Sequence, residues 1–154
     1  VDIQDSDENF SGYVRAQKAF ALLQKFEVAI RQFIELKMSE TFGVDWMKRQ
    51  LPSDMYQCWL DKKSKDSAER AALTSLIQYA DFSDYRKIIE RGDNWVSVFK
   101  PVFGRVEDVS ESLQRLGPVR IATMHARIVT LEDEVLLGSE VRRVLKAIQN
   151  VVSF

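Results

Sequence analysis

Hydrophobic residues recur at steps of three and four along most of the chain, and this is the spacing of one face of an α-helix. Runs of alternating apolar and polar residues, which are typical of β-strands, are scarce. The pattern therefore predicts an all-α fold with short connections. Its longest helix is expected at about residues 13–38, with an inward face made of Ala16, Phe20, Leu23, Phe26, Ile30, Phe33 and Ile34.

Turn-forming and capping residues divide the rest of the chain. Further helices are expected from Ser53-Asp54 onward and from about Ser67 to Tyr79. Gly117-Pro118 predicts that one helix ends and another begins, because proline is tolerated in the first helical turn. Thr130 followed by Asp133 has the spacing of a capping box, so the last helix is expected to begin there.

Composition and charge indicate one globular domain behind an acidic segment. Hydrophobic residues make up 45% of the 154 residues and charged residues 29%, values typical of a domain that buries its own core. The net charge is −1, yet the first ten residues contain four acidic side chains, so the remainder carries +3. We therefore expect a flexible segment at residues 1–12 and a helical domain at residues 13–154. The four acidic residues are Asp2, Asp5, Asp7 and Glu8.

Cysteine content and hydropathy restrict where the protein is expected to work. Cys58 is the only cysteine, so an internal disulfide is excluded, and this fits a reducing, intracellular compartment, either cytoplasmic or nuclear. No apolar run approaches the length that spans a bilayer, so no membrane association is expected. The chain starts with Val1 rather than methionine, and we interpret it as part of a larger protein.

His125 is the only histidine, and histidine is the side chain best suited to transfer protons near neutral pH. Arg120 lies five positions before it, and Arg127 lies two positions after it. If Pro118 opens a helix, the free backbone amides there and the helix dipole attract a phosphate, which Arg120 binds with two donors. His125 would then transfer a proton at that phosphate.

The same residues have structural alternatives. Arg120 can instead pair with a carboxylate on the preceding helix, such as Glu107 or Glu111, and a lone histidine is often structural. No cysteine, histidine or acidic residue stands at ligand spacing from His125, so neither a metal nor another cofactor is expected.

The second half of the chain resembles a known family. Residues 116–127, which include Arg120 and His125, resemble the Arg-x4-6-His motif of the HEPN superfamily. The surrounding residues resemble the subfamily found at the C-termini of larger multidomain proteins, including a eukaryotic PIN-domain endoribonuclease. The segments that carry this further resemblance are residues 79–84, 88–89 and 99–104, with Trp95.

The resemblance implies a bundle of four or five main helices with short additional helices, which forms a homodimer with the paired motifs in a cleft between subunits. It implies a metal-independent endoribonuclease, part of a larger defence or RNA-processing protein, in which the RNA 2′-hydroxyl attacks the adjacent phosphate. His125 would transfer the proton, and Arg120 would stabilise charge on the phosphorane. Arg127 and Thr123 would be auxiliary, RNA-binding residues. RNA is then the expected partner, beside a second copy and the other domains of the parent protein.

One position departs from the family pattern. Active members usually have a polar residue, often asparagine, directly after the arginine, and this chain has Ile121, which forms no side-chain hydrogen bond. Two alternatives to the enzyme therefore stay open. The first is a catalytically inactive HEPN dimerisation or interaction module, and the second is a purely structural bundle in which Arg120 and His125 have no chemical role.

Overall fold

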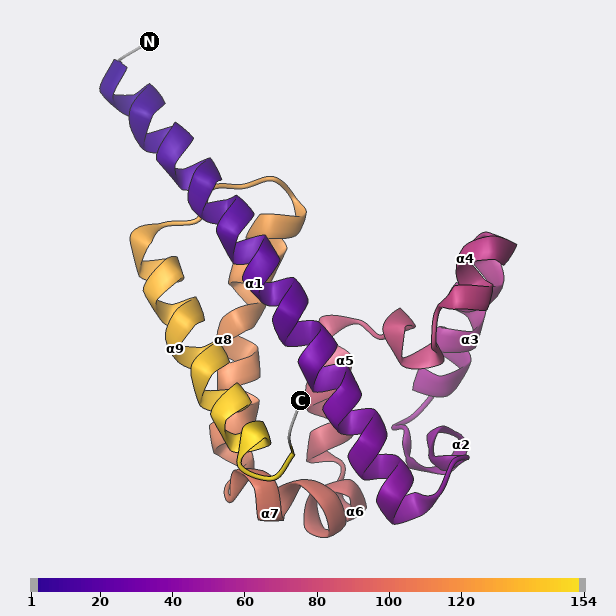
Figure 1. Ribbon diagram of the computed structural model, residues 1–154. Helices are drawn as coiled ribbons and strands as arrows, with labels where there is room; N and C mark the ends of the chain where they lie inside the picture. The colour runs from indigo at the N-terminus through magenta and orange to yellow at the C-terminus, as the bar shows by residue number, and fades with distance from the viewer. Residues whose placement is uncertain (1–2, 153–154) are drawn as a thin grey trace. The chain divides into compact units, whose positions relative to one another are not determined.

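The described part of the chain is entirely helical. The structure is a computed structural model that describes residues 3–152, and the side chains from Asp7 onward (Figure 1). These residues contain no β-strand, which confirms the predicted all-α class. The longer helices are α1 (Ile3–Phe42), α3 (Met55–Lys65), α5 (Phe82–Glu90), α8 (Val106–Met124) and α9 (Leu131–Gln149).

Short helices connect the longer ones. Two of them differ from the α-form: η1 is a 3-10 helix, and η2 is a π-helix. The segment predicted as one helix from Ser67 to Tyr79 is divided between α4 and η1, with Thr74 and Ser75 in extended conformation between them. The short elements are α2 (Trp46–Gln50), α4 (Ala68–Leu73), η1 (Leu76–Tyr79), α6 (Gly92–Asn94), η2 (Trp95–Phe99) and α7 (Lys100–Phe103).

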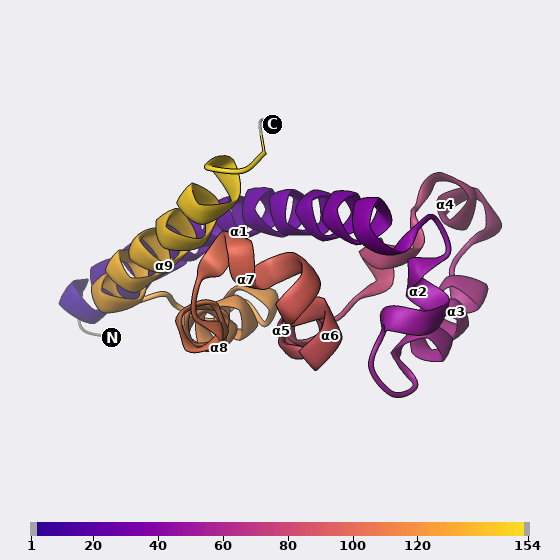
Figure 2. The same cartoon turned by 90° about the horizontal axis from the view of Figure 1, so that it is seen from below.

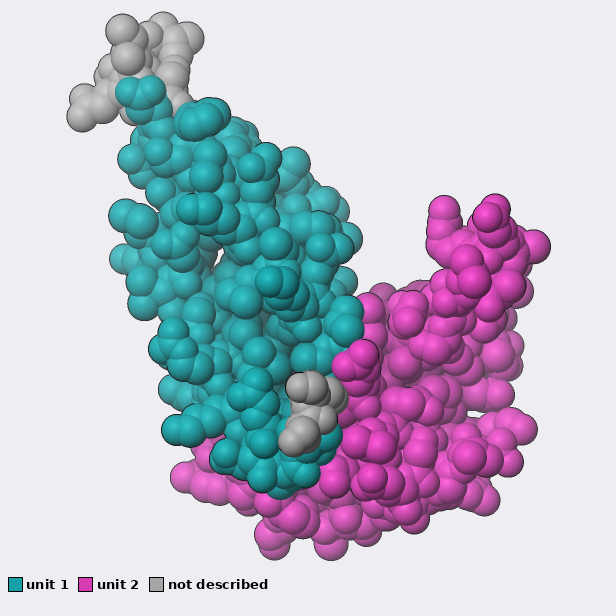
Figure 3. All heavy atoms as spheres, in the orientation of Figure 1, with its two compact units in different colours: residues 1–29, 109–154 teal, residues 30–108 magenta. Residues whose placement is uncertain are grey.

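The chain forms two compact units (Figure 3). Unit 1 consists of Val1–Ala29 and Val109–Phe154, and unit 2 consists of Ile30–Asp108. The long helix α1 contributes its first part to unit 1 and its second part to unit 2. The predicted domain boundary at residues 12 and 13 coincides with neither division, and it stays a prediction.

Unit 1 packs the first part of α1 against α8 and α9, which lie beside it in both ribbon views (Figures 1 and 2). Each helix turns one apolar stripe inward at steps of three and four, as the sequence predicts. Burying such a stripe stabilises each helix more than its intrinsic helix propensity does. The buried side chains include Leu23 and Phe26 of α1, Val109, Leu113, Leu116 and Val119 of α8, and Leu137, Val141, Val144 and Ile148 of α9.

Unit 2 is built around large aromatic side chains. Trp46, Trp59 and Tyr85 are completely buried, and Phe33 contacts the rings of both Phe99 and Phe103 at centroid distances of 6.0 and 5.9 Å. Edge-on and tilted ring contacts of this kind add to the burial of apolar area. They hold together helices that are individually too short to be stable.

Helix α1 differs from its prediction at both ends. It begins at Ile3 rather than near Tyr13 and continues to Phe42. The loop before α9 packs on its early turns, because Val129 N–H donates to the Gly12 carbonyl at 3.1 Å and Arg15 Nε donates to the Val129 carbonyl at 2.7 Å. A side chain at position 12 would meet Ile128 at 2.8 Å, so glycine is required there.

Helix α1 also differs from its prediction in the exposure of Phe20 and in the conformation of its first turns. Phe20 was predicted to face the core, but it is 40% exposed, whereas the other predicted inward residues are buried. The segment 1–12 was predicted to be flexible, and the structure has residues 3–12 as the first turns of α1. The side chains of Asp2 and Asp5, which carry half of the predicted acidic charge, lie outside the described part.

Candidate functional site

Helix α8 continues through Pro118, contrary to the predicted helix boundary. Proline removes one hydrogen bond from the ladder and restricts the residue before it through contacts with that residue's Cβ. Gly117 has no Cβ, which reduces this conflict. Leu113, Leu116 and Val119 are buried on one side of α8, so tertiary packing outweighs the cost of the proline. Arg120 therefore lies inside a helix, and the predicted phosphate site at a helix N-terminus does not form.

Arg120 is held by a carboxylate of α1. Its Nε donates to Oε1 of Glu27 at 3.2 Å, and the two side chains retain only 25% and 12% of their exposure. Pairing with a carboxylate was one of the structural alternatives, but Glu107 and Glu111 are not the partners: Arg115 takes Glu111, and Arg105 takes Glu107. Unit 1 thus contains a charge-assisted contact between α1 and α8, centred on the predicted site arginine.

His125 lies just beyond the C-terminal end of α8, whereas the predicted phosphate site was at the N-terminal end of a helix. The Arg127 N–H donates to the Ala122 carbonyl at 2.8 Å, and Ala126 has a φ of 54°. This is the Schellman arrangement that ends many helices. A helix C-terminus carries negative dipole potential, so α8 gives no dipole assistance to phosphate binding beside His125. The imidazole is exposed to solvent.

Arg120 and His125 diverge within one chain. Five positions along an α-helix correspond to a rotation of about 140° around its axis. The structure directs Arg120 to Glu27, while no hydrogen bond joins His125 to Arg120 among the described residues. The pair with Glu27 therefore directs Arg120 to α1, while His125 lies beyond the end of α8.

The two predicted auxiliary residues, Thr123 and Arg127, differ in their surroundings. The Thr123 hydroxyl donates to the Arg120 carbonyl at 2.7 Å, so this group serves the last turn of α8. Arg127 is exposed in the connection to α9, and its backbone takes part in the Schellman arrangement. Of the predicted auxiliary residues, Arg127 is therefore the one whose side chain is presented to solvent.

An apolar groove of about 410 Å³ lies beside the end of α8. It is lined by Tyr13, Ala16, Gln17 and Phe20 of α1, together with Thr123 and Ala126. Tyr13 and Phe20 are exposed, as are Ile121 and Met124 in the last turns of α8, which are 50% and 55% exposed. Ile121 and Met124 do not line the groove, whereas Tyr13 and Phe20 do, and exposed apolar side chains around a groove commonly mark an interaction site.

Glu27 is the residue that sequence reasoning missed. It falls among the buried positions of α1, between Leu23 and Ile30, where a charged side chain is unusual unless it is paired. Glu140 gives the same signal on α9, where it is 5% exposed and receives Nη1 of Arg115 at 3.3 Å. A carboxylate inside an apolar stripe is thus the sequence feature that indicates an arginine partner.

The described residues, 3–152, contain no candidate metal cluster and no candidate membrane span. No group of three or more histidine, cysteine, aspartate or glutamate side chains there can hold a metal ion. None of the helices in this range is long and apolar enough to cross a membrane.

Comparison of the chain with protein-family models, curated proteins and solved structures gives no match. The similarity to the HEPN superfamily therefore rests on the sequence motif and its surroundings.

Proposed function

We propose that this chain is a HEPN-like self-association module, in which Arg120 stabilises the bundle and takes no part in catalysis. The ion pair between Arg120 and Glu27 carries this proposal. An arginine that neutralises a buried carboxylate is not available to a phosphate unless that pair opens. Opening it leaves Glu27 charged and desolvated inside unit 1, which is costly.

The pairing surface of this module is the apolar region at the end of α8. It combines the groove beside Tyr13 and Phe20 with the exposed side chains of Ile121 and Met124. Two copies that meet through the same region bury these side chains from water, and a two-fold axis makes one such surface sufficient for a closed dimer.

Analytical ultracentrifugation of Met124→Glu tests the pairing surface. The wild-type protein should sediment as a dimer at micromolar concentration, and the variant should sediment as a monomer because a carboxylate is desolvated at the contact. Leu73→Glu is the matched control, since Leu73 is 83% exposed on unit 2 and should leave the dimer intact. A wild-type monomer, or equal effects of the two changes, contradicts the proposal.

A second candidate function is RNA cleavage at a site that two copies complete. The exposure of His125 and Arg127 beside the pairing surface favours it. In this reaction the 2′-hydroxyl loses its proton to a base such as His125 and attacks the adjacent phosphate. The 5′-oxygen leaves and takes up a proton, which yields a 2′,3′-cyclic phosphate and a 5′-hydroxyl end. Arg120 must exchange Glu27 for the phosphorane.

Glu27→Gln separates the two candidates, because it keeps the shape of the side chain and removes the charge that holds Arg120. If the dimer cleaves RNA, this variant should cleave faster, and His125→Ala should lower the rate about 10²-fold. Cleavage should persist in chelator and stop on RNA with a single 2′-deoxy nucleotide at the cut. If neither wild type nor Glu27→Gln cuts RNA, the module without catalysis is retained.

A further inference from the structure

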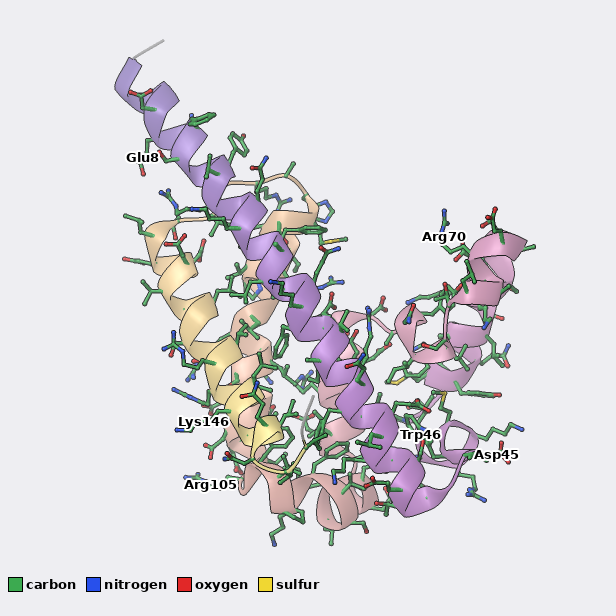
Figure 4. The ribbon with its side chains drawn as sticks, in the orientation of Figure 1. Glu8, Asp45, Trp46, Arg70, Arg105 and Lys146 are labelled. Atoms are coloured by element: carbon green, nitrogen blue, oxygen red, sulfur yellow. The ribbon has the colours of Figure 1, made fainter. Side chains whose placement is uncertain are left out.

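A second groove of unit 1, between α1 and α9, has an apolar floor and a cationic edge. Its volume is about 480 Å³. Leu22 of α1 and Val141 and Leu145 of α9 contribute the apolar lining, and Arg142 and Lys146 contribute the charged lining. Gly138 and Gln149 complete it. Lys146 extends from α9 toward solvent (Figure 4).

Two lysines of α1 extend the cationic edge. Lys18 and Lys25 lie four positions before and three positions after Leu22, and residues at these separations share one face of a helix. Both lysines are exposed. Arg142 and Lys146 of α9 therefore line the groove itself, and Lys18 and Lys25 lie on the same face of α1 as its lining residue Leu22.

The charge of these four residues is not neutralised within the part of the chain that the structure describes. None of them lies within ion-pair distance of a described carboxylate, and no acidic residue is among the described residues that line the groove. Arg143, the neighbour of Arg142, behaves differently: its guanidinium lies 3.8 Å from Glu140. The nearest acidic side chain on the same face of α9 is Glu134, one turn before Gly138.

We propose that this groove binds an acidic amphipathic helix of a partner protein. The apolar face of that helix packs on Leu22, Val141 and Leu145, and its flanking carboxylates pair with the cations on both sides. Helices commonly bind grooves in this way, through apolar anchors at steps of three and four. Gly138 leaves room for the partner helix to approach, because a Cβ at this position would meet no heavy atom within 4 Å.

The lining distinguishes this partner from a single strand of RNA. Proteins that bind single strands combine cations with aromatic side chains on which bases stack. Among the described residues, the groove is lined by aliphatic residues, glycine, glutamine and cations, and by no aromatic residue. Its composition therefore favours an aliphatic, acidic helix over a nucleic-acid strand.

This inference rests on the proposed function only in that it adds a second partner to the proposed interaction module. The pairing surface at the end of α8 and the groove between α1 and α9 are lined by different residues. Self-association and partner binding can therefore be measured separately. Loss of dimerisation with intact peptide binding overturns the proposed function alone, and the reverse result overturns this inference alone.

Fluorescence anisotropy with the full chain tests the groove. The probe is a labelled synthetic helix with leucine along one face and glutamate along both borders, and its control carries glutamine in place of each glutamate. The acidic peptide should bind, and the glutamine peptide should bind about tenfold more weakly. Added salt should weaken the acidic peptide's binding. Equal affinity of the two peptides, or binding of neither, overturns the inference.

Variants of the chain locate the binding. Arg142→Glu with Lys146→Glu should weaken the acidic peptide at least about tenfold, and Gly138→Leu should do the same by filling the groove. Gly138→Leu should keep its fold, because position 138 faces open space and leucine favours helix. Arg105→Glu, at a residue with a 74% exposed side chain outside the groove, should leave binding unchanged. A single-stranded RNA that binds in place of the peptide, and is lost in the double variant, overturns the inference.

Discussion

The buried carboxylates of unit 1 pair with arginines, whereas the buried polar contacts of unit 2 are an amide network around Asn94 and the hydrogen bond from the Trp59 indole to the Asp84 carboxylate. In unit 1, α8 contacts α1 through Arg120 and Glu27 and contacts α9 through Arg115 and Glu140. In unit 2, Asn94 is completely buried, donates to the carbonyls of Gln50 and Ile88 at 3.0 and 2.9 Å, and accepts from the Gln50 side chain.

Helix length explains the difference. A helix leaves its first amides and last carbonyls without partners, so a unit made of many short helices has many such groups to satisfy. In unit 2 several side chains bind these carbonyls: Arg91 donates to Arg49 and Leu51, and Lys63 donates to Thr74. The long helices of unit 1 satisfy most of their own backbone.

The two kinds of buried polar contact therefore have different roles. The ion pairs of unit 1 join side chains of different helices, and they determine which stripes face each other. The hydrogen bonds of unit 2 complete the backbone of the elements themselves. We expect the polar contacts of unit 2 to contribute more to stability, because a buried carbonyl that loses its donor there finds no alternative partner.

The largest effect is expected for Asn94→Leu in unit 2. It leaves the carbonyls of Gln50 and Ile88 buried without these donors, so the free energy of unfolding should fall by about 3 kcal/mol. Urea denaturation followed by circular dichroism measures it. Asn150→Leu is the control, since Asn150 is exposed and its loss should change stability by less than about 0.5 kcal/mol. Similar losses in the two variants contradict the role of the network.

A smaller effect is expected for Glu27→Leu in unit 1. The change leaves Arg120 beside an apolar side chain, and because Arg120 keeps 25% of its exposure the loss should be about 2 kcal/mol rather than the value for a fully buried pair. Glu27→Leu with Arg120→Met should recover about half of that loss or more. Urea denaturation of the wild type, of the single variants Glu27→Leu and Arg120→Met, and of the double variant gives the coupling energy, and strictly additive losses argue against the pair.

Two helix ends at which a residue has a positive φ allow a comparison between the units. Ala126 in unit 1 has a φ of 54°, and Gly104 in unit 2 has a φ of 81°. Ala126→Gly should raise the free energy of unfolding by about 1 kcal/mol, because alanine is strained there. Gly104→Ala should lower it by about the same amount, since a Cβ at position 104 meets nothing and only the backbone cost remains. Thermal unfolding measures both, and shifts of the same sign would falsify this account.

The smallest effect concerns Asp93 in unit 2. A hydrogen bond from Gln50, 2.7 Å long, and to a lesser degree the charge of Arg91, hold the pKa of the Asp93 carboxyl below its usual range, although desolvation opposes the shift. The folded state therefore binds this proton less readily than the unfolded chain. Its contribution to stability is complete near neutral pH and is lost as pH falls through the folded pKa.

Asp93→Asn should accordingly flatten the acid limb of the stability profile. Urea denaturation between about pH 6 and pH 3 should show a smaller decrease for the variant than for the wild-type protein. Asp45→Asn is the control, because Asp45 is exposed on the same unit with a single contact, to Lys48, at 4.0 Å. If the stability of wild type and of Asp93→Asn falls in parallel as the pH is lowered, Asp93 does not contribute to the loss of stability in acid.

Local patterns in the sequence determined the helical class and several helix ends. The step of three and four residues is a property of the helix itself, so the stripes of α1, α8 and α9 are read directly from the chain. The capping box of α9 is equally local: Thr130 Oγ1 accepts from the Asp133 amide at 3.1 Å, and the Asp133 carboxylate accepts from the Thr130 amide at 3.1 Å. The prediction at Thr130 is confirmed because both contacts lie within four consecutive residues.

The tertiary structure decided what the candidate site became. Local rules place a helix start at Pro118, and only the burial of Leu116 and Val119 on a shared face carries α8 through it. Local rules also favour Glu107 or Glu111 as partners of Arg120. The carboxylate that binds it belongs to Glu27, 93 positions away, because packing α8 against α1 brings these two side chains together and desolvates both.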